Sequence, residues 1–304
     1  MLEQLPQAKW FKGRKGPLVL VVMDGIGYGK LAAGDAVAAA NTPVLDWLHA
    51  HCPHTRLKAH GTAVGLPTDD DMGNSEVGHN AMGAGRVFDQ GAKLVNKSIT
   101  SGAMFSGQAW REVVDNVCSR GSSLHFLGLF SDGNVHSHID HLKQMLQKAA
   151  DQGVKKIRVH ILLDGRDVEK TSALKYVLPF EDFLAEVRAG GCDARIASGG
   201  GRMKITMDRY HANWSMVERG WRTHVLGAER QFPDARTAIE TLRSETGAID
   251  QDLDPFVIAG ADSQPVGRIQ DGDSVVFFNF RGDRALEITA AFEQEEFTYF
   301  NRGR

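Results

Sequence analysis

IRVHILLDGRD, residues 157–167, is an apolar run that ends in charged residues. Apolar residues that follow one another without alternation are typical of a parallel strand covered on both faces. Four other runs have the same form: GPLVLVVMDGIGYG (16–29), LHFLGLFSDG (124–133), ARIASGGG (194–201) and SVVFFNFRGDR (274–284). Two helical patterns lie between these runs. The first, at 138–153, ends in a glycine that is typical of a helix C-terminus, and the second, at 173–191, contains an internal proline. Because strands and helices alternate, the sequence predicts an α/β fold with a doubly wound sheet.

Composition narrows the class of protein. Of the 304 residues, 42% are hydrophobic and 24% are charged, as in globular proteins with a sizeable core. A net charge of −3 gives no reason to expect nucleic acid or an anionic membrane as a partner. Three widely spaced cysteines without a C-x-x-C pair argue for a reducing compartment. The early apolar run at 18–23 is too short for a signal peptide or a membrane span. We therefore expect a cytoplasmic enzyme.

Polar residues follow each of the predicted strands. They are Asp24, Ser131-Asp132, Asp164 to Asp167, Arg202, and the pair Arg281 and Arg284. In open α/β sheets, ligands bind beyond the carboxyl ends of the strands, so these residues are candidates for one site. Asp24 has two interpretations, a turn that bonds to nearby backbone N–H groups or a ligand of a hard metal ion. GIGYGK is not a dinucleotide-binding loop, because Lys30 stands where the third glycine is required.

Ser75 lies in the glycine-rich stretch TDDDMGNSEVGHNAMGAGR, residues 68–86. Its surroundings do not match the G-x-S-x-G elbow of hydrolases. One interpretation is a helix cap. The other is a nucleophile, because a helix N-terminus holds phosphate well and a neighbouring metal ion could remove the serine proton. The acidic residues Asp69, Asp70 and Asp71 are expected to form a solvated turn.

HSHIDH, residues 136–141, has two interpretations: a metal-binding tract, from the spacing of His138 and His141, or the opening turn of a helix. His136 lies on the strand side of the turn and is the better candidate to contact a ligand. Arg281 and Arg284 directly follow a buried strand, where a guanidinium can grip a carboxylate or phosphate with two bonds. Together these features predict metal-assisted phosphoryl chemistry on a small anionic substrate.

Several motifs in this order resemble those of one family: VVMDGIGYG, HGTAVGLPTDDDMGNSEVGHNAMGAGR, SDGNVHSH, DGRD, GGGRMKITMDRY and FNFRGDR. From residue 17 to 304 the chain resembles the cofactor-independent phosphoglycerate mutases of the alkaline phosphatase superfamily, and most of all their plant and trypanosomatid branch. The resemblance implies the N-terminal part of a phosphatase-like doubly wound sheet, residues 1–95, and an inserted α/β transferase domain, residues 96–304.

The same resemblance implies the site and the reaction. Asp24 and Ser75 would be ligands of one of two divalent metal ions, Mn²⁺ or Mg²⁺ with Co²⁺ as a further candidate, and Ser75 would be the phosphorylated nucleophile. The implied substrate contacts are His136, Arg166, Asp167, Arg202, Arg209, Arg281 and Arg284. The implied reaction interconverts 3-phosphoglycerate and 2-phosphoglycerate without added 2,3-bisphosphoglycerate, in a monomer.

Two features depart from the family pattern. Asn134 stands where the family more commonly has glycine, and we expect the turn to survive because asparagine tolerates left-handed backbone. The chain is also much shorter than family members, whose remaining metal ligands and a substrate lysine follow the transferase domain. We therefore expect this chain to be inactive alone. The competing hypotheses are a metal-dependent phosphatase of the same superfamily and a non-catalytic anion-binding fragment.

Overall fold

The computed structural model describes residues 9–29 and 31–303. Its internal contacts divide the chain into two units, with the division after Leu57. Each unit is described by itself. Among the described helices, none has the length and apolar character needed to cross a membrane.

The regular elements in the described residues of the first unit are short helices. They are the 3-10 helix η1 (Ala32–Gly34), α1 (Ala36–Ala39) and α2 (Pro43–His51). The carboxylate of Asp35 caps α1 by accepting from the Ala38 N–H at 2.9 Å. The guanidinium of Arg56 lies over the Tyr28 ring, 3.9 Å from its centroid.

The buried strand predicted within residues 16–29 is wrong for this chain. Residues 18–23 form no strand in the described structure, and their side chains are exposed, from 91% at Leu18 to 49% at Met23. The physical reason is that a strand needs a neighbour to accept its N–H groups and to cover its apolar faces. The described residues supply no such neighbour, because the strands all belong to one sheet of the second unit.

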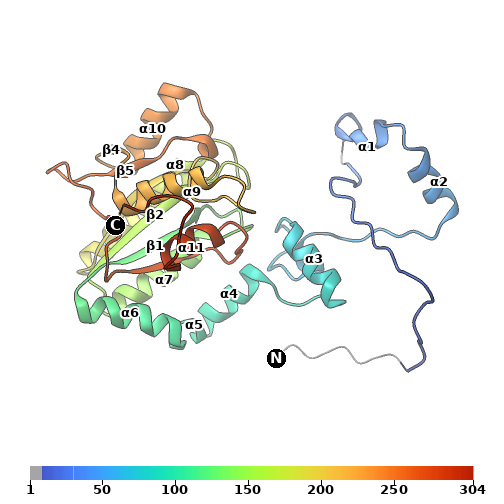
Figure 1. Ribbon diagram of the computed structural model, residues 1–304, viewed down its shortest axis with the longest axis horizontal. Helices are drawn as coiled ribbons and strands as arrows, with labels where there is room; N and C mark the ends of the chain where they lie inside the picture. Colours follow the sequence, from blue (N-terminus) through green and yellow to red (C-terminus); the bar gives the residue numbers. More distant parts are fainter. Residues whose placement is uncertain (1–8, 30, 304) are drawn as a thin grey trace. The chain divides into compact units, whose positions relative to one another are not determined.

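The second unit is built around a six-stranded mixed sheet (Figure 1). Its order is β4 (Arg230–Phe232), β5 (Phe256–Ile258), β3 (Asp193–Gly201), β2 (Lys156–Leu163), β1 (Leu124–Phe130) and β6 (Ser274–Phe277). Strands β3, β2, β1 and β6 are parallel, and β5 is antiparallel to β3. The four central predictions, at 124–133, 157–167, 194–201 and 274–284, are therefore confirmed as strands. β4 and β5 were not predicted, because three residues are too few to carry a periodic signal.

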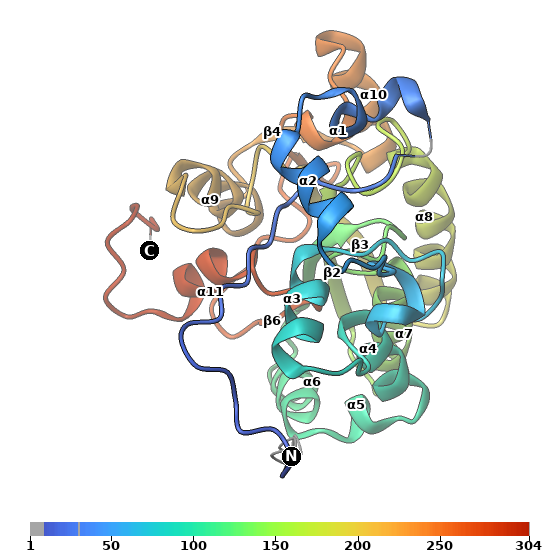
Figure 2. The same cartoon turned by 90° about the vertical axis from the view of Figure 1, so that its right-hand side faces the viewer.

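Both faces of the central strands are apolar, which explains their unbroken hydrophobic runs. In β1, Phe126 and Phe130 join one buried cluster, whereas Leu127 and Leu129 join another. The first cluster is covered by α6 (Gln108–Arg120), α7 (Ile139–Asp151), α8 (Ala173–Ala189) and α10 (Ala235–Thr246). The second is covered by α9 (Trp214–Trp221), the π-helix η3 (Arg222–Leu226) and α11 (Leu286–Glu293). Figure 2 shows α7 and α8 on one side of β2 and β3, with α9 and α11 on the other. The helices predicted at 138–153 and 173–191 are confirmed as α7 and α8.

The remaining elements of the second unit precede or border the sheet. They are the 3-10 helix η2 (Gly61–Val64), α3 (Ser75–Ala84), α4 (Gly91–Thr100), α5 (Ala103–Ser106) and the 3-10 helix η4 (Asp250–Asp252). Helix α4 spans residue 95, and the assignment of 1–95 and 96–304 to two domains stays a prediction.

Candidate anion-binding site

Polar residues gather where four parallel strands end. Because β3, β2, β1 and β6 are parallel neighbours, their carboxyl ends meet at one edge of the sheet. Ser131 follows β1, Asp164 follows β2 and Arg202 follows β3, and Arg281 follows β6 after a short loop. Four of the five polar strand ends predicted from the sequence are thus brought together. The fifth, Asp24, lies in the other unit.

A buried ion pair joins the ends of β2 and β3. Nη1 of Arg202 lies 2.9 Å from Oδ1 of Asp164 and 2.5 Å from Oδ2 of Asp167. The Asp164 carboxylate also accepts from the Ser131 hydroxyl at 2.6 Å, and from the N–H groups of Arg166 and Asp167, each at 3.1 Å. A buried charge pair is stable only when such additional bonds satisfy the carboxylate. Asp164 therefore holds Arg202 and the DGRD turn in place.

Asp283 is a site residue that the sequence analysis missed. Its Oδ2 lies 3.0 Å from Nη2 of Arg281 and 3.2 Å from Nη1 of Arg209. Its Oδ1 lies 3.7 Å from Nδ1 of His136. Asp283 thereby brings together three of the predicted substrate contacts. The available signal was its place in RGDR, between two of the predicted arginines.

His136 lies at the centre of this positive cluster. Burial, and after it the charges of Arg202, Arg281, Arg284 and Arg209 in that order, lower the pKa of His136 to about 2. The imidazole is therefore neutral at physiological pH. Its Nδ1 and Oδ1 of Asp283 are both buried without a hydrogen-bond partner. Buried polar atoms of this kind are normally satisfied, so these two mark a place where a polar ligand fits.

Arg284 and Arg166 complete the cluster. Nη1 of Arg284 donates to the carbonyl of Met207 at 2.7 Å. Burial lowers the pKa of Arg284, and the charges of Arg209, Arg202 and Arg166 act in the same direction while Asp283 opposes them. Arg166 itself is exposed at the border of the cluster. Several guanidinium groups compete for few carboxylates here, an arrangement that an anionic ligand stabilises.

Ser75 is the first residue of α3, and the helix-cap interpretation of this serine is wrong. Asn74 is the cap, because its side chain accepts from the Val77 N–H at 3.1 Å. The Ser75 hydroxyl is exposed and lies 3.2 Å from Nδ1 of His79. That nitrogen also lies 2.7 Å from the carbonyl of Ser75, which can only accept, so Nδ1 carries the proton. His79 is therefore not placed to take a proton from Ser75.

The N-terminus of α3 lies next to the arginine cluster. Oε2 of Glu76 is 3.4 Å from Nε of Arg281. Asn74, Glu76, Phe280 and Arg281 are among the residues that line one cavity of about 370 Å³. Ser75 is the residue between Asn74 and Glu76 in the sequence, at the N-terminal end of a helix dipole that favours anions.

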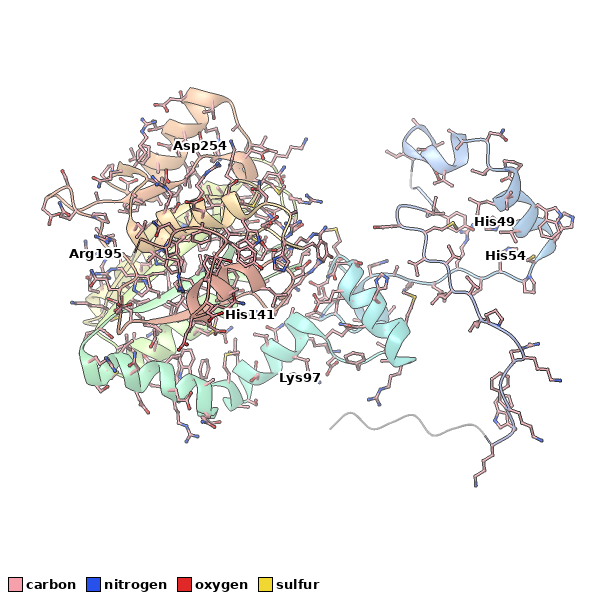
Figure 3. The ribbon with its side chains drawn as sticks, in the orientation of Figure 1. His49, His54, Lys97, His141, Arg195 and Asp254 are labelled. Carbon is pink, nitrogen blue, oxygen red and sulfur yellow. The ribbon has the colours of Figure 1, made fainter. Side chains whose placement is uncertain are left out.

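The histidine tract does not form a metal site. His138 caps α7, since its Nδ1 accepts from the Asp140 N–H at 3.2 Å. His141, labelled in Figure 3, is buried and pairs through Nε2 with Oδ1 of Asn96 at 2.6 Å. Burial lowers the pKa of His141 to about 4. The helix-opening interpretation of this tract is therefore confirmed.

The acidic turn and Asn134 meet in the second unit. Asp69 and Asp70 are exposed, as predicted. Asp71 accepts from the Thr68 N–H at 2.6 Å, and the Asn134 side chain donates to it as well. Asn134 has φ of 55°, which confirms that asparagine occupies the left-handed turn expected there.

Asp24 is exposed in its turn, next to Gly25 with φ of 78°. Its carboxylate and the Ser75 hydroxyl are oxygen donors, the class that Mg²⁺ and Mn²⁺ prefer. Residues 9–29 and 31–303 contain no group of three or more His, Cys, Asp or Glu side chains arranged to hold a metal ion. The donor chemistry of the two residues fits a hard cation, and their role as ligands stays a prediction.

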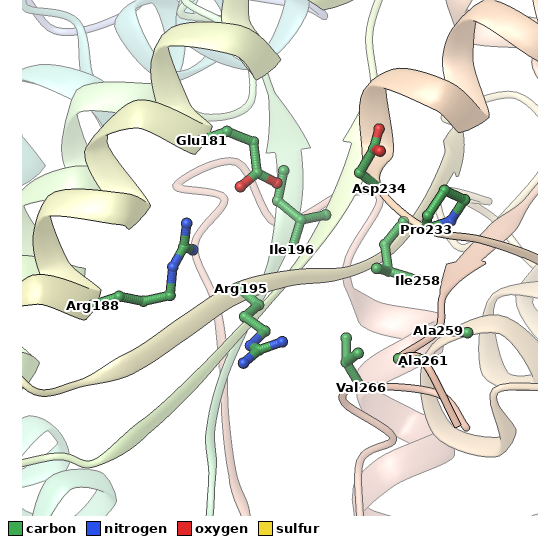
Figure 4. A pocket seen from close by; sticks show the side chains of 11 residues that line it. Glu181, Arg188, Arg195, Ile196, Pro233, Asp234, Ile258, Ala259, Ala261 and Val266 are labelled. Carbon is green, nitrogen blue, oxygen red and sulfur yellow. The ribbon is translucent and has the colours of Figure 1, made fainter. Parts of the chain in front are cut away.

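Another cavity, of about 570 Å³, lies near the opposite end of β3 (Figure 4). Glu181 and Arg188 of α8 and Arg195 of β3 line it. Both arginines are already engaged: Arg188 donates to the Ala194 carbonyl at 2.7 Å, and Arg195 donates to Asp193 at 2.6 Å. The candidate site is therefore the arginine cluster at the carboxyl edge and not this cavity.

Comparison with known proteins gives close relatives. The chain is 58% identical over 296 residues to the probable 2,3-bisphosphoglycerate-independent phosphoglycerate mutase of Leptospira interrogans, covering 96% of this chain and 54% of the relative. It is 55% identical over 289 residues to the 2,3-bisphosphoglycerate-independent phosphoglycerate mutase of Trypanosoma brucei brucei, covering 94% of this chain and 52% of the relative. A plant relative, the 2,3-bisphosphoglycerate-independent phosphoglycerate mutase of Mesembryanthemum crystallinum, is 48% identical over 290 residues, covering 94% of this chain and 52% of the relative. The chain therefore spans about half the length of these relatives.

Among solved structures, the chain resembles Leishmania mexicana phosphoglycerate mutase at low cobalt concentration. The TM-score is 0.89 at 52% sequence identity, covering 93% of this chain and 52% of that one. The predicted resemblance to the plant and trypanosomatid branch is confirmed by these relatives. A sequence model of the family described as BPG-independent PGAM N-terminus (iPGM_N) matches residues 95–304, and the chain belongs to this family of phosphoglycerate mutases.

Proposed function

We propose that this chain forms the substrate-holding part of an enzyme that interconverts 3-phosphoglycerate and 2-phosphoglycerate without added 2,3-bisphosphoglycerate. The observation that carries the proposal is the buried, neutral His136 among four arginines, at the edge where four parallel strands end. A phosphoglycerate carries a carboxylate and a phosphate, and guanidinium groups bind both with paired bonds.

Each residue of the cluster has a proposed role. Arg281, Arg284 and Arg209 bind the anionic groups of the substrate, and Arg166 closes the exposed border. Arg202 also binds an anionic group of the substrate, and its buried ion pair with Asp164 and Asp167 keeps its guanidinium rigid. His136 contacts the substrate through Nδ1, which is buried without a hydrogen-bond partner. These contacts keep the glycerate in place while its phosphoryl group is transferred.

Ser75 is the proposed carrier of the phosphoryl group. Its Oγ attacks phosphorus, the bond from phosphorus to the substrate oxygen breaks, and the proton of the serine ends on that substrate oxygen. The glycerate, held by the arginines, then presents its other hydroxyl, which takes the phosphoryl group back and returns a proton to Ser75. The free N–H groups at the start of α3 hold the phosphoryl oxygens. The exposure of Ser75, and the contact of the next residue, Glu76, with Arg281, support this role.

A divalent cation belongs to the same proposal. Asp24 and Ser75 are its proposed oxygen ligands in this chain, with Mn²⁺ or Mg²⁺ as the first candidates and Co²⁺ as another. When bound, such a cation lowers the pKa of a coordinated hydroxyl and screens the charge of the phosphoryl group.

The alternative of a simple phosphatase differs in what happens to the glycerate. A phosphatase must admit water and release the alcohol, whereas a mutase must retain the alcohol and exclude water. The buried cluster, which grips the part of the substrate that does not react, favours the mutase. The proposal also assigns residues 1–95 to a phosphatase-like domain and 96–304 to a transferase domain of a monomeric, cytoplasmic protein.

Calorimetric titration of the 304-residue chain tests the binding part of the proposal. We expect 3-phosphoglycerate to bind at least about tenfold more tightly than glycerol 3-phosphate, because only the former carries a carboxylate for the second set of guanidinium bonds. Equal affinity for the two ligands would contradict the proposed cage. Inorganic sulfate, which offers one anionic group, should bind more weakly than either.

A further inference from the structure

Six polar side chains form a continuous hydrogen-bonded chain inside the second unit. In order they are Asp273, His125 of β1, His160 of β2, Ser198 of β3, His224 of η3 and Thr206. All but Asp273 are buried, each with at most 1% of its surface exposed. None of them belongs to the anion site, and a buried polar network of this size, when each group is hydrogen-bonded, makes the surrounding core rigid.

The distances make every link a normal hydrogen bond. His125 Nε2 lies 3.0 Å from Oδ2 of Asp273, and His125 Nδ1 lies 2.9 Å from Nε2 of His160. His160 Nδ1 lies 2.7 Å from Oγ of Ser198, which lies 2.8 Å from Nδ1 of His224. His224 Nε2 lies 3.0 Å from Oγ1 of Thr206.

The place of the ring proton on His125 decides the direction of every bond. A carboxylate only accepts, so His125 donates to Asp273 from Nε2. In the proposed direction His125 has its ring proton on Nε2 alone, so its Nδ1 accepts from Nε2 of His160, whose Nδ1 accepts from Ser198. The Ser198 oxygen in turn accepts from Nδ1 of His224, and the hydroxyl of Thr206 donates to Nε2 of His224. Burial lowers the pKa of His160 well below its usual value and that of His224 to about 3, so both rings are neutral.

Thr206 ends the chain in a strained backbone conformation. Its φ is 66°, in the left-handed region that a β-branched residue rarely adopts. Its N–H donates to the carbonyl of Met216 at 3.0 Å. Gly220 packs against it so closely that a Cβ on this glycine would lie 2.2 Å from Oγ1 of Thr206. Strain of this kind persists only where surrounding contacts hold it, and it concentrates at functional sites.

The strained residue lies within the segment that supplies the anion site. Arg202 begins this segment and Arg209 ends it, and Met207, next to Thr206, accepts from Arg284 at 2.7 Å. We propose that Thr206 is a positioning residue of the anion site, held through its hydroxyl by the buried histidine chain so that residues 202–209 present Arg202, Arg209 and the Met207 carbonyl in fixed places. This inference rests on the proposed role of these arginines in holding phosphoglycerate.

Two substitutions of Thr206 distinguish the effect of its hydroxyl group from the effect of its side-chain shape. Thr206→Val keeps the β-branched form and removes the donor to His224, whereas Thr206→Ser keeps the donor. Thr223→Val is the matched control, because Thr223 is buried in η3, the π-helix that also contains His224. Its hydroxyl donates to the Arg219 carbonyl at 2.6 Å and takes no part in the histidine chain.

The first measurement is hydrogen exchange of the amides of residues 202–207 in the 304-residue chain without ligand. We expect exchange there to be about tenfold faster in Thr206→Val, and unchanged within about twofold in Thr206→Ser and Thr223→Val, since one hydrogen bond corresponds to about a factor of ten. Thr223→Val should lower only the melting temperature. Equal exchange in Thr206→Val and wild type would overturn the positioning role.

The second measurement is the affinity for 3-phosphoglycerate, which should fall about tenfold in Thr206→Val and recover in Thr206→Ser. If the wild-type chain fails to bind 3-phosphoglycerate, the proposed function fails, whereas the exchange of residues 202–207 still decides whether Thr206 holds the segment.

A third measurement needs no substitution. Nitrogen-15 spectra of the histidine rings should show the proton on Nε2 in His125 and His160 and on Nδ1 in His224. The opposite tautomer in His224 would mean that it donates to Thr206, and it would overturn the proposed direction of the chain even if Thr206→Val does not fold.

Discussion

Nε of Arg281 lies 3.4 Å from Oε2 of Glu76, so the residue after Ser75 contacts an arginine that follows β6. This contact places the start of α3 against the cluster around His136. The proposed nucleophile and the arginines proposed to hold its substrate would need to lie within reach of one ligand, and this contact supports that proposal. The proposed chemistry leads to the following expected outcomes.

Arg281→Ala should weaken binding of 3-phosphoglycerate by about 1.5–3 kcal/mol, the usual contribution of a hydrogen bond to a charged group. Calorimetric titration of the chain measures this change. Arg236→Ala serves as the control, because its ion pair with Glu240 is on the surface, where the two side chains are 61% and 49% exposed. If the two variants bind equally well, Arg281 does not contact the substrate.

Ser75→Ala should abolish phosphoryl transfer and leave binding of 3-phosphoglycerate within about twofold of wild type, because the arginines remain. The activity is measured with an enolase-coupled assay in a chimera that joins this chain to the remaining part of the Leptospira relative. Turnover above about 1% of the unsubstituted chimera would show that the phosphoryl group travels by another route, since loss of a nucleophile commonly costs several orders of magnitude.

The free energy of unfolding should fall as the pH falls below about 6.5. Burial lowers the pKa of His136 to about 2, of His224 to about 3 and of His141 to about 4, from the usual 6.5. The unfolded chain therefore binds more protons than the native chain below pH 6.5, and each such histidine adds up to about 1.4 kcal/mol per pH unit to the slope. The stabilisation is complete above this pH and is lost progressively in acid.

Urea unfolding between pH 4.5 and 7.5 measures this slope. His141→Gln should flatten it by up to about 1.4 kcal/mol per pH unit, because one buried neutral histidine is removed. The exposed His54, changed to Gln, should leave the slope unaltered. The same slope in both variants and in wild type would show that His141 protonates in the native state as readily as in the unfolded chain.

Asn134→Gly should be more stable than Asn134→Ala by about 1–2 kcal/mol, the cost of a side chain in left-handed backbone. Both variants lose the bond to Asp71, so the difference isolates the effect of φ, which is 55°. The matched pair at the exposed helical residue Gln144 should show the opposite order, with alanine more stable than glycine by about 1 kcal/mol. Chemical denaturation of the four variants checks this, and the same order at both positions would contradict it.

The 304-residue chain should show no mutase turnover with Mn²⁺, and amides of residues 18–23 should exchange faster than those of β1. The apolar residues before Asp24 are exposed and unpaired in the described structure, so no strand holds its carboxylate in place. Hydrogen exchange and the enolase-coupled assay test the two parts separately. Equal protection of residues 18–23 and Leu124–Phe130 would mean that the first segment is held by contacts we have not identified.

Most of the sheet could be predicted from the sequence. The runs at 124–133 and 157–167 are apolar on both faces, and each ends in polar residues, which is the pattern of a buried parallel strand. Because parallel neighbours share a carboxyl edge, the same runs also indicated where Asp164, Arg202 and Arg281 would meet. The exception was the run at 16–29, since apolar character shows that a segment can form a strand but not that a partner strand is available to it.

What the sequence alone determined was therefore the set of local structures and the chemical types at the strand ends, because these depend on periodicity and on neighbouring residues. Only the tertiary structure decided which charges pair. Asp283 joins Arg209 and His136, and Asp164 binds Arg202, through contacts between segments distant in the chain. The buried histidine chain is of the same kind, since its bonds link Asp273 to side chains of β1, β2, β3 and η3. Pairing between distant segments is set by the packing of the whole core, which no local pattern records.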